Sequence, residues 1–163
     1  MKHAIICDID GTIADIRHRL HYIKNPDGAK KSKPDWDAFH AACVDDTPFR
    51  DVMRVVDTLR VGSCGCAYKR LDLYFLSGRS EAVREQTEQW LDSTWISELG
   101  SYAGLLMRKK GDHRPDTEIK LEMIRELRLT PEDVLCIFDD RQCVVDMWRA
   151  NGYRVMQVDA WEE

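Results

Sequence analysis

The stretch Ile5-Ile6-Cys7-Asp8-Ile9-Asp10-Gly11-Thr12 constrains the fold of this chain more than any other. An apolar run leads directly into two carboxylates one residue apart, and Gly-Thr then favours a turn. A buried strand with this ending places its acids at the carboxyl edge of a parallel sheet, where open α/β sheets bind ligands. We expect the strand to end at Ile9, so that the Asp8 side chain and the Asp10 backbone converge. Such a pair of acids favours a cation or a shared proton, although an acidic turn after an edge strand is the alternative.

The rest of the chain alternates between strand-like and helix-like patterns. After the first strand, further strands are expected over residues 71–76, 105–107, 134–138 and 153–158. Helical patterns lie between them, ending near residues 92, 127 and 151. This alternation predicts an α/β fold, with about five parallel strands and helices on both faces of the sheet.

A long segment separates the first strand from the second. About fifty residues lie between them, which is too many for a simple crossover. Ile13, Ile16, Leu20 and Ile23 recur at helical spacing, and two further helical patterns follow. We therefore expect a small helical cap of approximately residues 13–62 over the active site, within one domain of residues 1–163. In its second helix Trp36 and Phe39 share a face, where they form the core of the cap or stack a nucleic-acid base.

Composition limits the kind of protein this is. A length of 163 residues fits one domain, and 44% hydrophobic with 33% charged residues is typical of a globular protein. No apolar run approaches the roughly 18 residues of a membrane span, and no signal peptide is recognisable. We expect a cytoplasmic protein with reduced cysteines, in which the role of Cys64 and Cys66 stays open. The net charge of −5 argues against a long basic track, but it allows recognition of a single nucleic-acid end.

Reactive groups follow several of the expected strands, and the crossover rule gathers them at one edge of the sheet. Asp139-Asp140 follow the fourth strand, and with Asp8 and Asp10 they form an oxygen-only cluster suited to Mg²⁺ if the two strands are adjacent. Ser77-Gly78-Arg79-Ser80 supplies a hydroxyl, a glycine amide and a helix N-terminus, which favour an anion. Lys120 brings a positive charge to the same edge. Together these groups indicate phosphoryl transfer.

The same residues resemble, in order, the four motifs of the haloacid dehalogenase superfamily of phosphatases. Within it, the chain is similar over almost its full length to the 3′-phosphatase domain of bacteriophage-type polynucleotide kinase-phosphatases. The similarity includes the segment 111–116 leading to Lys120 and the segment 139–142 leading to residues 144–149. No Gly-x-x-x-x-Gly-Lys-Ser/Thr loop occurs in the sequence, so the resemblance concerns the phosphatase and not the 5′-kinase.

The resemblance implies Mg²⁺-dependent removal of 3′-terminal phosphate from DNA or RNA ends, or from nucleoside 3′-monophosphates. It implies Asp8 as the nucleophile that forms an aspartyl-phosphate, and Asp10 as general acid and base. Lys120 would hold the phosphoryl oxygens, and Asp116 would orient Lys120 or an arginine. The implied metal ligands are Asp8, the backbone of Asp10, and Asp139 or Asp140. The implied substrate-binding residues are Thr12, Arg19, Ser77, Gly78, Arg79 and Asp116.

Other functions fit parts of this pattern. A 5′(3′)-nucleotidase or a general small-molecule phosphatase would carry the same motifs, because these motifs describe the phosphate and not the leaving group. A phosphoacceptor signalling module also combines a parallel sheet with clustered acids. Its phosphoacceptor follows the third strand, however, where this chain has Arg108-Lys109-Lys110. The preference for DNA or RNA, a separate kinase or ligase partner, and assembly into a homo-oligomer are left open.

Overall fold

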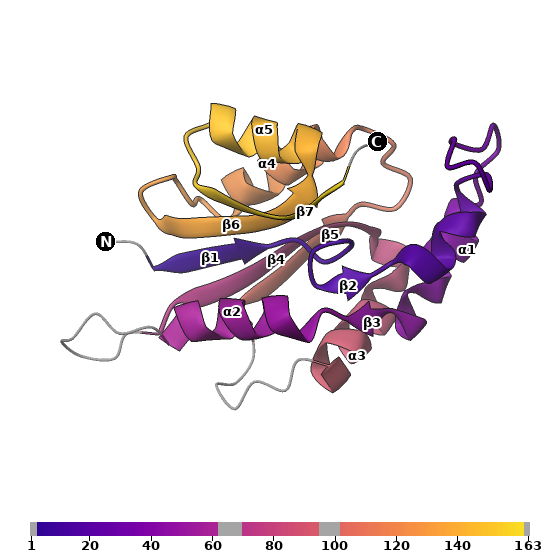
Figure 1. The fold of residues 1–163 in the computed structure, drawn as a ribbon. Helices are drawn as coiled ribbons and strands as arrows, with labels where there is room; N and C mark the ends of the chain where they lie inside the picture. Colours follow the sequence, from indigo (N-terminus) through magenta and orange to yellow (C-terminus); the bar gives the residue numbers. More distant parts are fainter. Residues whose placement is uncertain (1–2, 62–69, 95–101, 162–163) are drawn as a thin grey trace.

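A computed structural model describes residues 3–61, 70–94 and 102–161 of the chain. Within these ranges, five parallel strands form one sheet in the order β5-β4-β1-β6-β7 (Figure 1). Their bounds are β1 Ala4–Cys7, β4 Asp72–Ser80, β5 Gly104–Arg108, β6 Val134–Arg141 and β7 Val155–Trp161. The predicted α/β fold is confirmed. Because β6 is a direct neighbour of β1, the acids that follow or end these two strands come together at one edge.

Helices cover both faces of the sheet (Figure 1). Their bounds are α2 Arg50–Val61 and α3 Arg84–Thr94 on one face, and α4 Asp116–Glu126 and α5 Gln142–Ala150 on the other. Successive residues of β1 point to opposite faces, so Ile5 belongs to the core that contains Val56 of α2, and Ile6 belongs to the separate core that contains Trp148 of α5. A strand buried on both faces must be apolar throughout, which explains the uninterrupted run before Asp8.

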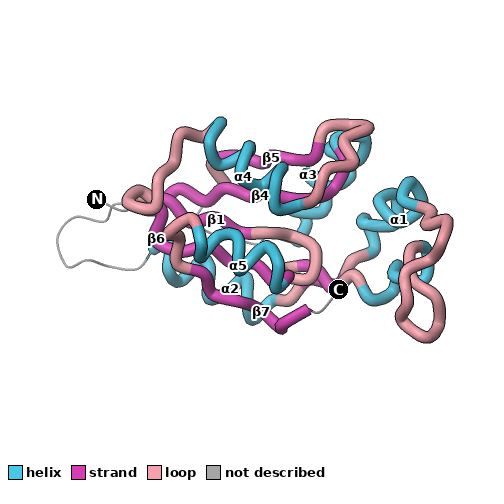
Figure 2. The backbone as a smooth tube through the Cα atoms, turned by 90° about the horizontal axis from the view of Figure 1, so that it is seen from above, coloured by secondary structure: helices cyan, strands magenta, loops and turns pink. Residues whose placement is uncertain are grey.

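A two-stranded antiparallel ribbon stands at the carboxyl edge of the sheet. It pairs β2 (Ala14–Asp15) with β3 (Thr47–Pro48). The residues between these strands, 16–46, are called here the cap segment, and they contain three short helices. These helices are η1 Arg17–Tyr22, α1 Trp36–Ala41 and η2 Ala42–Asp45. Figure 2 shows α1 and the loop before it standing apart from the helices that cover the sheet. The cap bounds of 13–62 stay a prediction. The last helix within these bounds, α2, packs against the sheet as part of its hydrophobic core.

Two local predictions differ from the structure. The helix expected from Ile13 is replaced by β2 and a 3₁₀ helix, because the carbonyl of Ile9 accepts hydrogen bonds from the amides of Thr12, Ile13 and Ala14 in a tight turn. The strand expected over residues 71–76 is longer than predicted, because β4 continues to Ser80 alongside β5. The helical turns start only after Ser80, whose hydroxyl accepts a hydrogen bond from the amide of Ala82.

No helix among the described residues is long and apolar enough to cross a membrane. Of the described cysteines, Cys7, Cys43 and Cys136 are buried and Cys143 is exposed. Cys64 and Cys66 lie outside the described residues.

Candidate active site

Asp8 follows β1 directly and lies in a buried cluster of charge. The ammonium of Lys120, from the second turn of α4, lies 2.9 Å from Oδ1 of Asp8 and 2.8 Å from Oδ2 of Asp139. All three side chains are buried. Burial raises the pKa of Asp8, and the charge of Asp139 adds to this effect, although Lys120 opposes it. The structure thus brings together the predicted nucleophile, lysine and metal ligand.

Asp10 lies two residues further and has different neighbours. Its Oδ1 accepts hydrogen bonds from Nη2 of Arg19 at 2.7 Å and from Nε of Arg79 at 2.8 Å. Burial alone would raise the pKa of Asp10, but the guanidinium groups of Arg79 and Arg19 outweigh it and lower the pKa to about 2. Both arginines have no exposed surface. They were predicted as substrate-binding residues, and here they hold Asp10.

A third acid, Asp46, completes this network and was missed in the sequence. It follows η2 at the end of the cap segment and is buried. Its carboxylate accepts hydrogen bonds from Nε of Arg19 at 2.7 Å and from Nη2 of Arg79 at 2.6 Å. The imidazole of His18 lies 2.9 Å from the same carboxylate. Two guanidinium groups are therefore shared between Asp10 and Asp46, which balances their charge.

Asp140 lies at the end of β6 beside the turn that follows Asp8. Its Oδ1 accepts a hydrogen bond from the Thr12 hydroxyl at 3.2 Å. Gly11 has a φ of +82°, and a Cβ at this position would lie 2.2 Å from Oδ2 of Asp140, so only glycine fits here. Burial raises the pKa of Asp140 to about 7, with the charge of Asp139 as the next cause.

The residues present fit a divalent cation. Asp8, Asp139 and Asp140 each offer an oxygen, and these oxygens lie within 4.8 Å of one another. Oδ1 of Asp139 is buried and finds no hydrogen-bond partner within the described ranges, while Oδ2 accepts hydrogen bonds from Lys120 at 2.8 Å and from the indole of Trp148 at 3.2 Å. Three carboxylates against one ammonium leave excess negative charge, and oxygen ligands of this kind suit Mg²⁺.

The remaining predicted residues line the same edge. Ser77 is fully buried, and its hydroxyl accepts a hydrogen bond from the amide of Arg79 at 3.2 Å. A Cβ on Gly78 would lie 2.8 Å from Oδ1 of Asp116, so the glycine allows this acid to approach β4. The carboxylate of Asp116 binds two arginines, Arg108 of β5 and Arg141 of β6. Asp116 therefore joins the ends of two strands, while its part in catalysis stays a prediction.

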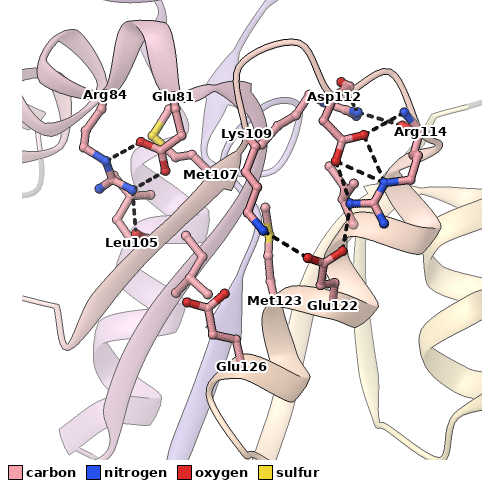
Figure 3. Close-up of a pocket in the computed structure, with 13 residues that line it drawn as sticks. Glu81, Arg84, Leu105, Met107, Lys109, Asp112, Arg114, Glu122, Met123 and Glu126 are labelled. Atoms are coloured by element: carbon pink, nitrogen blue, oxygen red, sulfur yellow. Dashed lines mark hydrogen bonds and ion pairs between the residues drawn. The ribbon is translucent and has the colours of Figure 1, made fainter.

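A separate cavity of about 200 Å³ lies between β5, α4 and the turn before α3 (Figure 3). Its cations are already paired with acids. Arg84 contacts Glu81 at 2.6 Å, and Arg114 and Lys109 contact Glu122 at 2.7 and 3.2 Å. None of the acids of the metal cluster lines this cavity. It is therefore distinct from the carboxylate cluster, and the described residues that line it carry acids beside their cations, which does not favour a phosphate.

Known proteins share sequence and fold with this chain. The chain is 30% identical over 146 residues to an Autographa californica nuclear polyhedrosis virus protein, whose name describes a bifunctional polynucleotide kinase/RNA ligase. The aligned region is 90% of this chain and 18% of the viral protein. A chain from the structure of the Pnkp1/Rnl/Hen1 RNA repair complex matches with a TM-score of 0.74 and 29% identity, covering 98% of this chain and 43% of that chain. This chain thus spans less than half the length of these relatives.

More distant structures share the fold. The L-2-haloacid dehalogenase from Xanthobacter autotrophicus matches with a TM-score of 0.58 at 13% identity, over 100% of this chain and 80% of that chain. Residues 2–162 match the family HAD_PNKP, described as the polynucleotide kinase PNKP phosphatase domain. The fold of the chain is haloacid dehalogenase-like. Because the family match spans nearly the whole chain, the chain belongs to the family of PNKP phosphatase domains.

Proposed function

We propose that this domain removes 3′-terminal phosphate from DNA or RNA ends, or from nucleoside 3′-monophosphates, in a Mg²⁺-dependent reaction. The observation that carries the proposal is the contrast between two neighbouring acids. Asp8 faces the ammonium of Lys120, whereas Asp10 is held by two arginines. Pairs of acids in contrasting environments take different roles in catalysis. Membership of the family supports a phosphatase, and the name of the family supports a polynucleotide end as substrate.

Asp8 is the nucleophile in this proposal. Its free carboxylate oxygen attacks phosphorus and the bond to the 3′-oxygen breaks, which leaves an aspartyl-phosphate. Asp10 donates a proton to the departing 3′-oxygen, and then takes a proton from the water that hydrolyses the intermediate. Lys120 stabilises the charge on the phosphoryl oxygens. Mg²⁺, held by Asp8, Asp139 or Asp140 and the backbone of Asp10, supplies further positive charge when bound.

The low pKa of Asp10 must rise before it can act as an acid. In the free site Arg19 and Arg79 keep it ionised, which suits the later step in which it takes a proton. A phosphate monoester brings two negative charges beside Asp10 and competes for the same guanidinium groups, so its arrival raises the pKa of Asp10. We therefore assign Arg19 and Arg79 a role through Asp10, while Ser77, Gly78 and Thr12 remain the proposed neighbours of the phosphate.

A substrate panel tests the leaving group. Initial rates are measured with 3′-phosphorylated DNA and RNA oligonucleotides, 3′-mononucleotides and 5′-mononucleotides, each with Mg²⁺ and with EDTA. We expect 3′-phosphorylated ends to be hydrolysed fastest, and EDTA to abolish the reaction. Preference for 5′-mononucleotides would overturn this assignment in favour of a nucleotidase.

A second experiment tests the covalent step. Asp8→Asn should abolish turnover, and mass spectrometry of acid-quenched wild-type protein should detect a phosphoryl group on the peptide that contains Asp8. Asp45→Asn, which changes an exposed acid outside the site, serves as the matched control. Normal hydrolysis by pure Asp8→Asn protein would refute the mechanism.

We also propose that the domain works beside kinase and ligase activities, in the same polypeptide or in a separate one. The support is that its relatives are longer proteins, one named for kinase and ligase activities and one from an RNA repair complex. The test is the sealing of a broken RNA with 3′-phosphate and 5′-hydroxyl ends by an added kinase and ligase. Sealing without this domain would refute the proposal.

A further inference from the structure

Trp36 is half exposed although its ring is well supported. It begins α1, and 49% of its surface is accessible. Its ring meets Phe39 edge-on, with centroids 5.7 Å apart, and lies 6.1 Å from the ring of His40 at an interplanar angle of 29°. The start of α1 is fixed because the Asp35 amide donates to the carbonyl of Tyr22 at 3.0 Å. The cap segment thus presents an indole in a defined orientation.

This indole is connected to the proposed catalytic acid through only two side chains. Phe39 is buried, and the guanidinium carbon of Arg19 lies 4.2 Å from the centre of its ring. Arg19 in turn donates to Asp10 at 2.7 Å. Trp36 therefore lies at the rim of the proposed active site and not on a remote surface.

His40 adds a hydrogen-bonding group at the same rim. Its Nδ1 is buried and has no hydrogen-bond partner among the residues that the structure describes. Burial lowers the pKa of His40, and the charges of Arg19 and Arg79 add to this effect while Asp10 opposes it. A buried polar atom without a partner is unfavourable, and a ligand with a donor or acceptor would relieve this.

The loop before α1 carries positive charge. It contains Lys31 and Lys33, and the structure pairs neither ammonium with a carboxylate of the described residues. The loop is held in a hairpin by hydrogen bonds from the Asn25 amide to the carbonyl of Ala29 and from the Lys31 amide to the carbonyl of Ile23. Figures 1 and 2 show it extending beside α1. In a chain of net charge −5, lysines three and five residues before an exposed indole form a local combination that suits a single strand.

We propose that Lys31, Lys33, Trp36 and His40 form a binding surface for the nucleic-acid strand that leads to the 3′-phosphate. The base nearest the phosphate stacks on Trp36, and backbone phosphates further upstream contact Lys31 and Lys33. The inference rests on the proposed 3′-phosphatase function and makes a polynucleotide end, rather than a mononucleotide, the preferred substrate. An exposed indole offers a stacking face to any base, so this surface favours strands without reading their sequence.

The stacking is tested with two matched substrates. One is a 3′-phosphorylated oligonucleotide, and the other has the same sequence but lacks the terminal base. Trp36→Ala should lower kcat/KM for the first substrate at least about tenfold more than for the second, because one base stack is lost. Trp36→Phe should restore most of the difference. Met156→Ala, which truncates an equally exposed apolar side chain on β7, should not change the ratio.

The phosphate contacts are tested by salt dependence. Each contact to a single strand contributes roughly 0.7 to the slope of log binding constant against log salt. Lys31→Ala/Lys33→Ala should therefore reduce this slope for the oligonucleotide by roughly 1.4. The control is Arg125→Ala/Arg128→Ala. These exposed residues lie in the last turn of α4 and just after it, outside the cap segment, and should leave the slope unchanged.

The outcomes separate this inference from the function on which it rests. If wild-type protein hydrolyses 3′-phosphorylated strands but Trp36→Ala affects both substrates equally, or the lysine variant keeps the wild-type slope, the surface is refuted and the phosphatase stands. If wild-type protein hydrolyses only 5′-mononucleotides, the proposed function falls and the inference falls with it.

Discussion

Asp46→Ala would remove the carboxylate that anchors both arginines of the Asp10 network. Asp46 accepts hydrogen bonds from Nε and Nη2 of Arg19 at 2.7 and 2.8 Å and from Nη2 of Arg79 at 2.6 Å. Its side chain and both arginine side chains are fully buried. After the substitution two guanidinium groups would share the single carboxylate of Asp10. Breaking a buried ion pair costs about 3–5 kcal/mol, because one charge is left uncompensated.

That cost converts into a measurable shift in melting temperature. In a domain of this size, 1 kcal/mol changes Tm by about 2–4 °C, so Asp46→Ala should melt roughly 6–20 °C below wild type by circular dichroism. At temperatures where the variant is folded, kcat should fall about 100-fold, because Asp10 is no longer held in one position. Asp46→Asn keeps an acceptor but not the charge, and its Tm should lie between those of Asp46→Ala and wild type.

The neighbouring residue provides a matched control. Asp45 is exposed, and Asp45→Ala should stay within about 0.5 kcal/mol of wild type, as surface substitutions usually do. If Asp46→Ala has the same Tm as Asp45→Ala and keeps the wild-type kcat, Asp46 does not support Asp10, and the proposed role of the network is refuted.

Three further perturbations address the carboxylate cluster. Lys120→Met removes the ammonium between Asp8 and Asp139, and should lower the free energy of unfolding of metal-free protein by about 3–5 kcal/mol. In urea titrations, Mg²⁺ should restore part of the lost free energy of unfolding. Equal losses with and without Mg²⁺ would contradict a site in which Lys120 and the metal contact the same carboxylates. Gly11→Ala places a Cβ 2.2 Å from Oδ2 of Asp140, and should raise the Mg²⁺ concentration for half-maximal activity at least about tenfold. The pKa of Asp140 is raised from 3.8 to about 7 by burial and by Asp139. Between these pH values the native state binds the proton that the unfolded chain has released. The contribution of Asp140 to the free energy of unfolding is therefore fully present below about pH 4. It is lost as the pH rises through about 7, and the loss is at most about 4 kcal/mol. Metal-free protein should melt at a lower temperature at about pH 8 than at about pH 5, and Asp140→Asn should reduce that difference. A Tm that rises over this range would contradict the assignment.

The carboxylate cluster of Asp8, Asp139 and Asp140 was accessible from sequence because its signal is local. An apolar run on a doubly buried strand can end in acids only at the edge of the sheet, and both β1 and β6 carry this pattern. What the pattern could not show is that β6 lies directly beside β1, since the order of strands follows from the packing of helices on both faces. The assembly of Asp8 with Asp139 and Asp140 was therefore conditional until that order was known.

Asp46 could not be found in this way. Nothing in the sequence distinguishes it from Asp45, and it lies 27 residues from Arg19 and 33 from Arg79. The contact depends on the pairing of β2 with β3, which are two residues long each. Such short strands show no alternation that a sequence pattern could reveal. Likewise, the local sequence of Arg19 is that of a surface arginine, and its burial is explained only by its contacts with Asp10, Asp46 and Phe39.

The aromatic residues of α1 show why residue spacing alone could not separate core from binding surface. Trp36 and Phe39 share a helical face in the sequence, yet one is half exposed and the other is buried under Arg19. A helix of six residues has too few positions for a wide apolar stripe, so only the residue next to the charged network is covered. The arginine that holds Asp10 therefore also fixes Phe39, and Phe39 in turn supports the ring of Trp36. Through these contacts the cap segment can couple a base on its outer surface to the acid beneath it.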